Sequence, residues 1–433
     1  MRVLHIGKFF PPHPGGIERT CADLCAGLAS DGVTTAVLAH AEPGSWRGRR
    51  LRHGDVDVTL AACLGQWIYA PVSPGFGWRL SRLIAQFKPD LLHLHLPNTS
   101  AFWALLLPAA RRLPWVVHWH ADIPLDSQRL GLRLAYRVYR PWEQALLRRA
   151  RAVIATSAPY RDSSAALAPW LSKTIVIPLG LPDLTPSPLT ASGERVGVRG
   201  QRHGDASTQT EASPPHPALS PSASDGGEGK EIAWPMSGLR LLGVGRLSYF
   251  KGFDVLLRAL ARIPDASVVL IGEGECAGNL RQLANELDIA DRVKFAGRID
   301  IDAGGQARLA DAYARCDIFC LPSTERAESF GLVLLEAMRA GKATIASDIP
   351  GSGVGFVVRD GETGILVAPG DVETLVAAIR RLQADPSQRQ RLGDAGNRRW
   401  QDEFTLEQAT QRLLALYRDV LAESCRETTR PTT

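Results

Sequence analysis

Short apolar runs alternate with helix-forming segments along most of the chain, a pattern typical of doubly wound parallel α/β proteins. The runs expected to be buried strands are 3–7, 91–95, 115–117, 153–157, 239–243, 267–271 and 317–323. Helices are expected at 20–29, from residue 253 onward, and at 332–340, where Gly341 ends the helix. Ligands of such folds bind beyond the carboxyl ends of the strands, so the residues that follow each run are the candidates for a site.

Two glutamates, Glu328 and Glu336, stand with seven residues between them where a strand should turn into a helix. Glu336 then falls about one and a half turns into that helix. The free amides near Gly331 favour a diphosphate, and the two carboxylates can bind hydroxyl groups of a sugar. An isolated pair could equally be a loop acid and a solvated helix residue, so this interpretation depends on the other motifs.

Two cations, Arg246 and Lys251, lie five residues apart in a glycine-containing loop after the run at 239–243. Positive charges near a helix N-terminus are poorly placed unless an anion joins them. A guanidinium suits phosphate in a bidentate manner, and an ammonium supplies a point charge. We therefore expect both side chains to contact one diphosphate, with solvated cations as the alternative.

The first run, at 3–7, leads into a loop that contains Gly15 and Gly16. Paired glycines permit close approach of the backbone to phosphate or to an anomeric carbon, although they are also ordinary turn residues. Ser157 ends the run at 153–157, where a helix cap is the alternative to a binding role.

Two histidines, His118 and His120, follow the run at 115–117. This spacing could suggest a metal site, but we expect none. His93 and His95 form a second such pair, and the alternation of a strand places both members of each pair on one face.

In this order the motifs resemble those of glycosyltransferase family 4, whose signature is two glutamates with seven residues between them. The resemblance covers nearly all of 1–180 and 238–415. It implies two Rossmann-like doubly wound domains that face each other across a cleft, the GT-B fold. The domains would span 1–184 and 236–403, with a C-terminal helix at about 404–425 that returns to the first domain.

The same resemblance implies a retaining, metal-independent hexosyltransferase with a nucleotide-diphosphate sugar as substrate and no cofactor. It assigns Arg246 and Lys251 to the leaving diphosphate, Glu336 to the ribose and Glu328 to the sugar hydroxyls. His120 would orient the sugar, His118 would be a satisfied histidine, and Ser157 would lie on the acceptor side. The implied donor site also includes Gly15, Gly16, Phe330, Gly331 and Leu332. Mannose is the favoured sugar, and a glycan or polyprenyl-linked acceptor of exopolysaccharide or lipopolysaccharide synthesis is implied.

Charge is unevenly distributed over the 433 residues, whose formal net charge is +5. Residues 1–180 carry 21 Lys and Arg against 11 Asp and Glu. Much of this excess falls in 47–52 and in 129–151, where Arg133, Arg137 and Arg140 recur beside Tyr136, Tyr139 and Trp142. A basic amphipathic helix of this kind favours an anionic membrane surface, with a solvated arginine face as the alternative. Nucleic acid is not expected, because no recognition motif accompanies the charge.

The seven cysteines are scattered, with no C-x-x-C, which argues against zinc and against a disulfide framework. We read no signal peptide and no spanning segment. The expected location is therefore the cytoplasm, at the inner face of the cytoplasmic membrane.

One segment, 185–235, is rich in Pro, Ser, Gly and charge, and is expected to be a disordered insertion between the domains. The residues 272–277 formally fit a dinucleotide fingerprint, but Glu273 and Glu275 would repel a pyrophosphate. The D-x-D sequences at 55–57 and 300–302 lie away from the motif-bearing loops. A nucleotide-binding oxidoreductase and an inactive glycan-assembly scaffold are the alternatives to a transferase.

Overall fold

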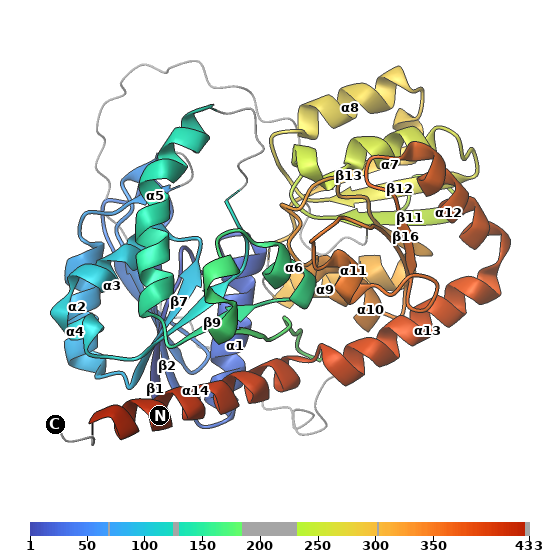
Figure 1. Cartoon of the computed structure of the whole chain (residues 1–433). Coiled ribbons are helices and arrows are strands. Elements are labelled where there is room, and N and C mark those ends of the chain that lie inside the picture. Colours follow the sequence, from blue (N-terminus) through green and yellow to red (C-terminus); the bar gives the residue numbers. More distant parts are fainter. Residues whose placement is uncertain (68–69, 124–129, 184–231, 301–302, 429–433) are drawn as a thin grey trace, which may run out of the picture. The chain divides into compact units, whose positions relative to one another are not determined.

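The computed structural model describes residues 1–67, 70–123, 130–183, 232–300 and 303–428. The chain builds two β-sheets in succession, each flanked by helices (Figure 1). Residues up to 182 and the described residues from 232 onward form one unit by their contacts. We refer to residues 1–183 as the first lobe and to residues 232–403 as the second lobe. The order of strands and helices confirms the predicted pair of doubly wound α/β domains.

The first lobe contains an eight-stranded sheet in the order β10-β9-β8-β7-β1-β2-β4-β3, in which β3 alone runs antiparallel to its neighbour. Its strands are β1 (Arg2–Ile6), β2 (Thr34–His40), β3 (Arg49–His53), β4 (Val56–Ala61), β7 (Leu91–Leu96), β8 (Trp115–Trp119), β9 (Ala152–Ala155) and β10 (Thr174–Val176). A separate hairpin joins β5 (Gly65–Trp67) to β6 (Ala70–Val72). The helices are α1 (Gly16–Ser30), α2 (Phe76–Phe87), α3 (Trp103–Leu106), α4 (Pro108–Arg111), α5 (Leu130–Arg149) and α6 (Ala158–Ser163).

The second lobe contains a six-stranded parallel sheet in the order β13-β12-β11-β14-β15-β16. Its strands are β11 (Leu239–Val244), β12 (Ala266–Ile271), β13 (Val293–Gly297), β14 (Ile318–Leu321), β15 (Ala343–Ser347) and β16 (Ile365–Val367). The helices are α7 (Phe253–Leu260), α8 (Ala277–Glu286), α9 (Ala303–Arg315), α10 (Leu332–Arg339), α11 (Val354–Val357), α12 (Val372–Ala384) and α13 (Pro386–Glu403).

Strand β7 shows how the sequence places two layers on the first sheet. All its residues are buried, as expected for a central parallel strand covered on both faces. Leu92 and Leu94 pack in the core beneath α2, whereas Leu91 packs with residues of α1 on the opposite face. Alternation puts His93 and His95 on the face of Leu91.

The last helix, α14 (Leu406–Thr428), returns to the first lobe, as predicted (Figure 1). Leu413 and Tyr417 are buried in the same cluster as Val3 and Leu24. The first lobe is therefore completed by the end of the chain.

The start of the first helix differs from the prediction by four residues. Helix α1 begins at Gly16 rather than at residue 20, so Gly16 and Arg19 lie in the helix and not in the preceding loop. An acidic residue in the first turn, Glu18, suits this early start. Of the segment expected at 185–235, residues 185–231 lie outside the described residues. Ile232 is buried in the core of the second lobe, and Trp234 Nε1 donates to Leu241 O at 3.3 Å.

Candidate active site

Lys251 and Glu328 form a buried ion pair in the loops that follow β11 and β14. Lys251 Nζ lies 2.5 Å from Glu328 Oε2, which also accepts a hydrogen bond from Ser323 Oγ at 3.0 Å. Both charged side chains are almost completely buried. Two predicted site residues that stand 77 positions apart in the sequence are therefore in direct contact in the second lobe.

Glycines let the loop that carries Lys251 approach its neighbours. Gly252 has φ +65°, and a Cβ at this position would lie 1.9 Å from the carbonyl oxygen of Pro322. Gly245 has φ +147°, and its missing Cβ leaves room for the Lys251 side chain. Glycine is the residue that tolerates these conformations and this close backbone contact.

Glu336 is buried in α10, and side chains that the sequence analysis did not name hold its carboxylate. Arg19 from α1 forms an ion pair with Glu336 Oε1, and Tyr313 Oη donates to Glu336 Oε2 at 2.8 Å. Burial raises the pKa of the nearby Asp23 to about 6, and Arg19 opposes that shift. The contact to the ribose remains a prediction, but the structure adds a partner from the first lobe.

The residues between the two glutamates would offer a ligand their backbone groups, because their side chains pack in the core or are absent. Phe330 is buried in the core of the second lobe, with its ring edge-on to Phe404 at 6.2 Å between centroids. Gly331 caps α10 with φ +80°, and Leu332 packs partly into the same core. A ligand at this point would therefore meet the amides at the start of α10, whose orphan N–H groups suit an anion.

Arg246 is exposed, and it lies near two first-lobe residues that the sequence analysis missed, Lys8 and Glu18. Burial lowers the pKa of Lys8, Glu18 counteracts this shift, and the positive charge of Arg246 adds to it. Burial likewise raises the pKa of Glu18. The Glu18 carboxylate occupies the space where a Cβ on Gly15 would project, which explains a glycine at that position.

His120 lies in a buried stack of imidazoles. One of its ring nitrogens, Nε2, lies 2.9 Å from His95 Nδ1, and its ring stacks on His118 with 4.2 Å between centroids. Burial lowers the pKa of His118 to about 3, and that of His120 well below its ordinary value. Within the described residues both ring nitrogens of His118 lack a hydrogen-bond partner, so the prediction of a satisfied histidine was wrong.

Ser157 caps α6, and its Oγ accepts a hydrogen bond from the amide of Tyr160 at 3.3 Å. The helix cap therefore accounts for this hydroxyl, and the acceptor-side role remains a prediction. Asp122, two residues after His120, has a clearer structural role. Its carboxylate forms an ion pair with Arg326 of the second lobe at 2.5 Å. Asp122 also accepts hydrogen bonds from Trp119 and Ser164.

The alternative motifs have structural explanations. A Cβ on Gly272 would lie 1.9 Å from Gly245 O, and one on Gly274 would lie 2.5 Å from Leu247 O. The glycines of the apparent dinucleotide fingerprint thus permit packing of two loops. Asp55 forms an exposed ion pair with Arg52, and residues 301–302 of the second D-x-D lie outside the described residues.

Comparison with known proteins matches each half of the chain to a glycosyltransferase domain. The model of the glycosyl transferase 4-like domain matches residues 15–180, and that of the glycosyl transferases group 1 matches residues 229–399. The chain is 28% identical to the D-rhamnosyltransferase WbpZ of Pseudomonas aeruginosa, over 94% of this chain and 92% of the relative. It is 26% identical to the O-antigen chain mannosyltransferase C of Escherichia coli, over 97% and 99%.

Solved structures support the fold. Sucrose-phosphate synthase from Thermosynechococcus elongatus superposes with a TM-score of 0.71 at 23% identity, over 98% of this chain and 100% of that one. HepE of Anabaena in complex with UDP superposes with a TM-score of 0.65 at 20% identity, over 97% and 100%. No helix in the described part of the chain is both long and apolar enough to cross a bilayer. Together the two domain matches and the fold show that the chain belongs to the GT-B glycosyltransferases of the family 4 type.

Proposed function

We propose that the chain is a retaining glycosyltransferase that moves a hexose, with mannose favoured, from a nucleotide-diphosphate sugar to a glycan or lipid-linked acceptor of cell-surface polysaccharide. The observation that carries the proposal is the buried Lys251–Glu328 pair beside the start of α10. Ammonium, carboxylate and free helix amides there offer partners for both a diphosphate and a sugar. The relatives named for mannosyl and rhamnosyl transfer support a hexose of this kind.

The proposed reaction begins with loosening of the bond between the anomeric carbon and the diphosphate. Lys251 and the exposed Arg246 offset the negative charge that develops on the leaving group. Because Lys251 and Ser323 hold the Glu328 carboxylate, we propose that Glu328 binds sugar hydroxyls and does not attack the anomeric carbon. Same-face attack by the acceptor hydroxyl, with its proton passing to the donor phosphate, would retain the anomeric configuration.

In this scheme His120 acts as a neutral group, since burial holds its pKa well below the ordinary value. A neutral imidazole can position a sugar hydroxyl but cannot neutralise a phosphate. We therefore propose that Arg246 and Lys251 supply this charge and that transfer does not depend on a metal ion. The expected result is that transfer continues in excess chelator, and strict dependence on added Mn²⁺ or Mg²⁺ would contradict the scheme.

We further propose that the acceptor is presented at the inner face of the cytoplasmic membrane, to which the chain binds peripherally. The support is the exposed basic face of α5 together with the lipid substrate in the name of a relative, the phosphatidyl-myo-inositol mannosyltransferase of Mycolicibacterium smegmatis. That relative is 28% identical over 89% of this chain and 85% of its own length.

The donor is tested most directly by thermal unfolding with GDP, UDP, ADP and their hexose derivatives. A nucleotide at a hundred times its Kd stabilises the folded chain by about 2.7 kcal/mol. We expect GDP and GDP-mannose to raise Tm most. In a second assay, labelled mannose should be transferred to a lipid-linked acceptor, and the α configuration of the donor should be retained. A larger shift with UDP would reject mannose as the donor sugar. No shift with any nucleotide would reject the donor site itself.

A further inference from the structure

A buried histidine–cysteine cluster, which includes His120, lies in the layer between the first sheet and helices α1 and α14. Its members come from β1, β7, β8, the residue that follows β8, and α1, and all are buried. They are His5, Cys21, Cys25, His93, His95, His118 and His120. Strand pairing sets His5 beside His93 and His95 beside His118, so the imidazoles stack across three neighbouring strands.

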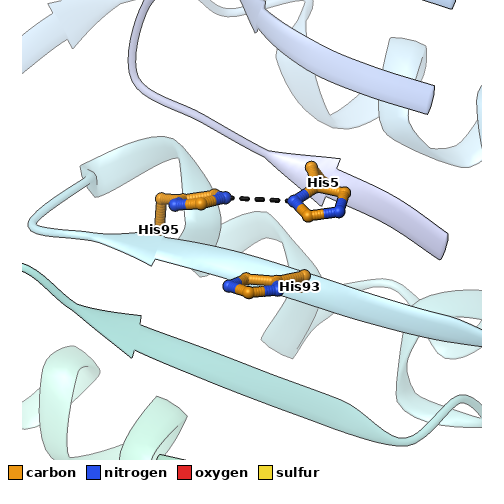
Figure 2. Close-up of side chains that lie close together, drawn as sticks. All are labelled: His5, His93 and His95. Atoms are coloured by element: carbon orange, nitrogen blue, oxygen red, sulfur yellow. Dashed lines mark hydrogen bonds between the residues drawn. The ribbon is translucent and has the colours of Figure 1, made fainter. Parts of the chain in front are cut away.

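The donor atoms of this cluster converge. One ligand atom each from His5, Cys21 and Cys25 lies within 4.8 Å of the others. His5 Nδ1 and His95 Nε2 face each other at 3.1 Å (Figure 2), and the thiol of Cys21 is within hydrogen-bonding reach of both Cys25 and His95. Ligand atoms around tetrahedral zinc are about 3.3–3.8 Å apart, given bonds of about 2.0–2.3 Å. His5, Cys21 and Cys25 already lie near this spacing, and His95, which contacts His5 and Cys21, would complete the set by moving toward Cys25.

The cluster is also short of hydrogen-bond partners. Within the described residues the buried nitrogens His5 Nε2 and His93 Nε2, and both nitrogens of His118, have none. An unsatisfied buried polar group costs about 1–3 kcal/mol, and native proteins seldom tolerate several in one place. The second ring nitrogen of His93, by contrast, is held by the Tyr417 hydroxyl of α14. The hydrogen bonds of the cluster therefore do not by themselves account for burying so many imidazoles together.

We propose that Cys21, Cys25, His5 and His95 bind one Zn²⁺ ion as a structural site of the first lobe. Two thiolates and two neutral imidazoles form a tetrahedral S₂N₂ set, which suits zinc. The two thiolate charges would balance the ion, so the filled site would be neutral, as its complete burial requires. His120, hydrogen-bonded to His95 Nδ1, would fix the orientation of that ligand. The ion would join α1 to β1 and β7, and α1 carries the Arg19 that holds Glu336.

The metal site does not rest on the proposed transfer reaction, although both use His120, and its test measures metal and not activity. The full chain is produced in zinc-supplemented medium, dialysed against EDTA to remove exchangeable ions, and analysed for metal by mass spectrometry. We expect about one zinc per chain, because a buried structural ion is released only with unfolding. The double variant Cys21→Ala/Cys25→Ala should retain almost none.

A matched control is available in Cys316→Ala/Cys320→Ala, since these two cysteines have the same spacing and are buried in the second lobe. This control should keep its zinc. Equal zinc in the two double variants would overturn the proposal, as would a folded native chain without zinc after unfolding and refolding in ZnCl₂.

If the double variant fails to fold, cobalt binding by the native chain and by a single variant still decides the matter. Refolding in CoCl₂ should produce the thiolate-to-cobalt charge-transfer absorption of a tetrahedral site, and the single variant Cys25→Ser should weaken it. Folded native chain that shows no such absorption, or that shows it unchanged in Cys25→Ser, would reject the S₂N₂ site.

Discussion

At the scale of residues, the two glutamates of the signature are held in different ways. Lys251 and Ser323 of the same lobe hold Glu328, whereas Glu336 receives Arg19 from the first lobe and Tyr313 from its own. Burial of a carboxylate is costly unless it is paired, so neither glutamate is a passive loop residue. We propose that donor binding exchanges these partners for groups of the nucleotide sugar.

Replacement Glu336→Gln preserves shape but removes the charge. A hydrogen bond to a charged group is worth about 1.5–3 kcal/mol, so donor binding or turnover should fall roughly ten- to a hundredfold. Isothermal titration with the donor and initial-rate kinetics measure the two effects. The control is Glu407→Gln, an exposed glutamate of α14. Unchanged kinetics in a folded Glu336→Gln variant would refute the assigned role.

The Lys251–Glu328 pair predicts a specific pattern of stability. Lys251→Met leaves Glu328 buried without its cation and should cost about 3–5 kcal/mol, whereas Lys251→Met with Glu328→Gln should cost clearly less. Both variants should lose transfer activity. Urea unfolding provides the free energies.

The exposed pair Arg262–Glu373 serves as the control cycle, because solvent screens such a pair and leaves little coupling between its members. Additive losses at Lys251 and Glu328 would show that the buried pair is not coupled.

Among the helices, α5 shows most clearly that spacing in the sequence does not determine which side chains are exposed. Arg133, Arg137 and Arg140 are exposed, as predicted, but Tyr136 and Tyr139 are turned partly inward. Tyr136 donates to Glu143 at 3.0 Å, and Tyr139 packs on Phe102. The exposed apolar side chains are instead Leu134, Val138 and Trp142. Tyr136 and Tyr139 therefore pack partly against the first lobe, and Trp142 remains as the exposed aromatic residue of the basic face.

We expect the native chain to sediment with anionic vesicles at low salt, and less so as salt rises. Basic residues near an anionic leaflet contribute about 1 kcal/mol each, so Arg133→Glu/Arg137→Glu/Arg140→Glu should abolish binding. The control triple variant changes Arg398, Arg412 and Arg418, exposed arginines of α13 and α14, to Glu. Equal binding by the native chain and the α5 variant would disprove the role of this helix.

The buried Glu143 of α5 predicts a pH dependence. Burial raises its pKa to about 7, while Tyr136 opposes the shift. The folded state therefore holds a proton that the unfolded state releases near its ordinary pKa. This contribution to stability is complete below about pH 4.5 and is lost as pH rises through about 7, at up to about 1.4 kcal/mol per unit.

Glu143→Gln cannot ionise, so its stability relative to the native chain should improve by an amount on the order of 3 kcal/mol between pH 4.5 and 8. Denaturant unfolding at both pH values measures the difference. The exposed Glu423→Gln should show no such change. A constant difference at Glu143 would mean that the carboxyl is ionised in the folded state.

At the scale of the whole molecule, the low-complexity segment should be dispensable. Replacing residues 186–229 with a flexible Gly/Ser connection should preserve Tm and transfer, since the segment's composition offers little to a core. A longer deletion that also removes 232–235 should destabilise, because burial of a side chain such as Ile232 contributes about 1.5–3 kcal/mol. Insoluble protein from the shorter replacement would show that the segment supports folding.

Much of the architecture followed from the sequence alone. Apolar runs such as 239–243 and 267–271 became adjacent parallel strands, because burial on both faces leaves a continuous hydrophobic signal. Glycines marked the tight loops, and the loop cations and glutamates stood after those strands. These features are local in the chain, so a residue pattern can report them.

Which distant side chains meet depends on how separate elements pack. Lys251 with Glu328, Arg19 with Glu336, and Asp122 with Arg326 join residues from separate elements, and no spacing rule predicts such pairs. The inward turn of Tyr136 depends on the packing of α5 and not on its periodicity. The same holds for Cys21 and Cys25, which show no zinc motif in sequence. Their partners, His5 and His95, reach them only because β1 and β7 pair beneath α1, and chain folding is what brings ligands from three elements together.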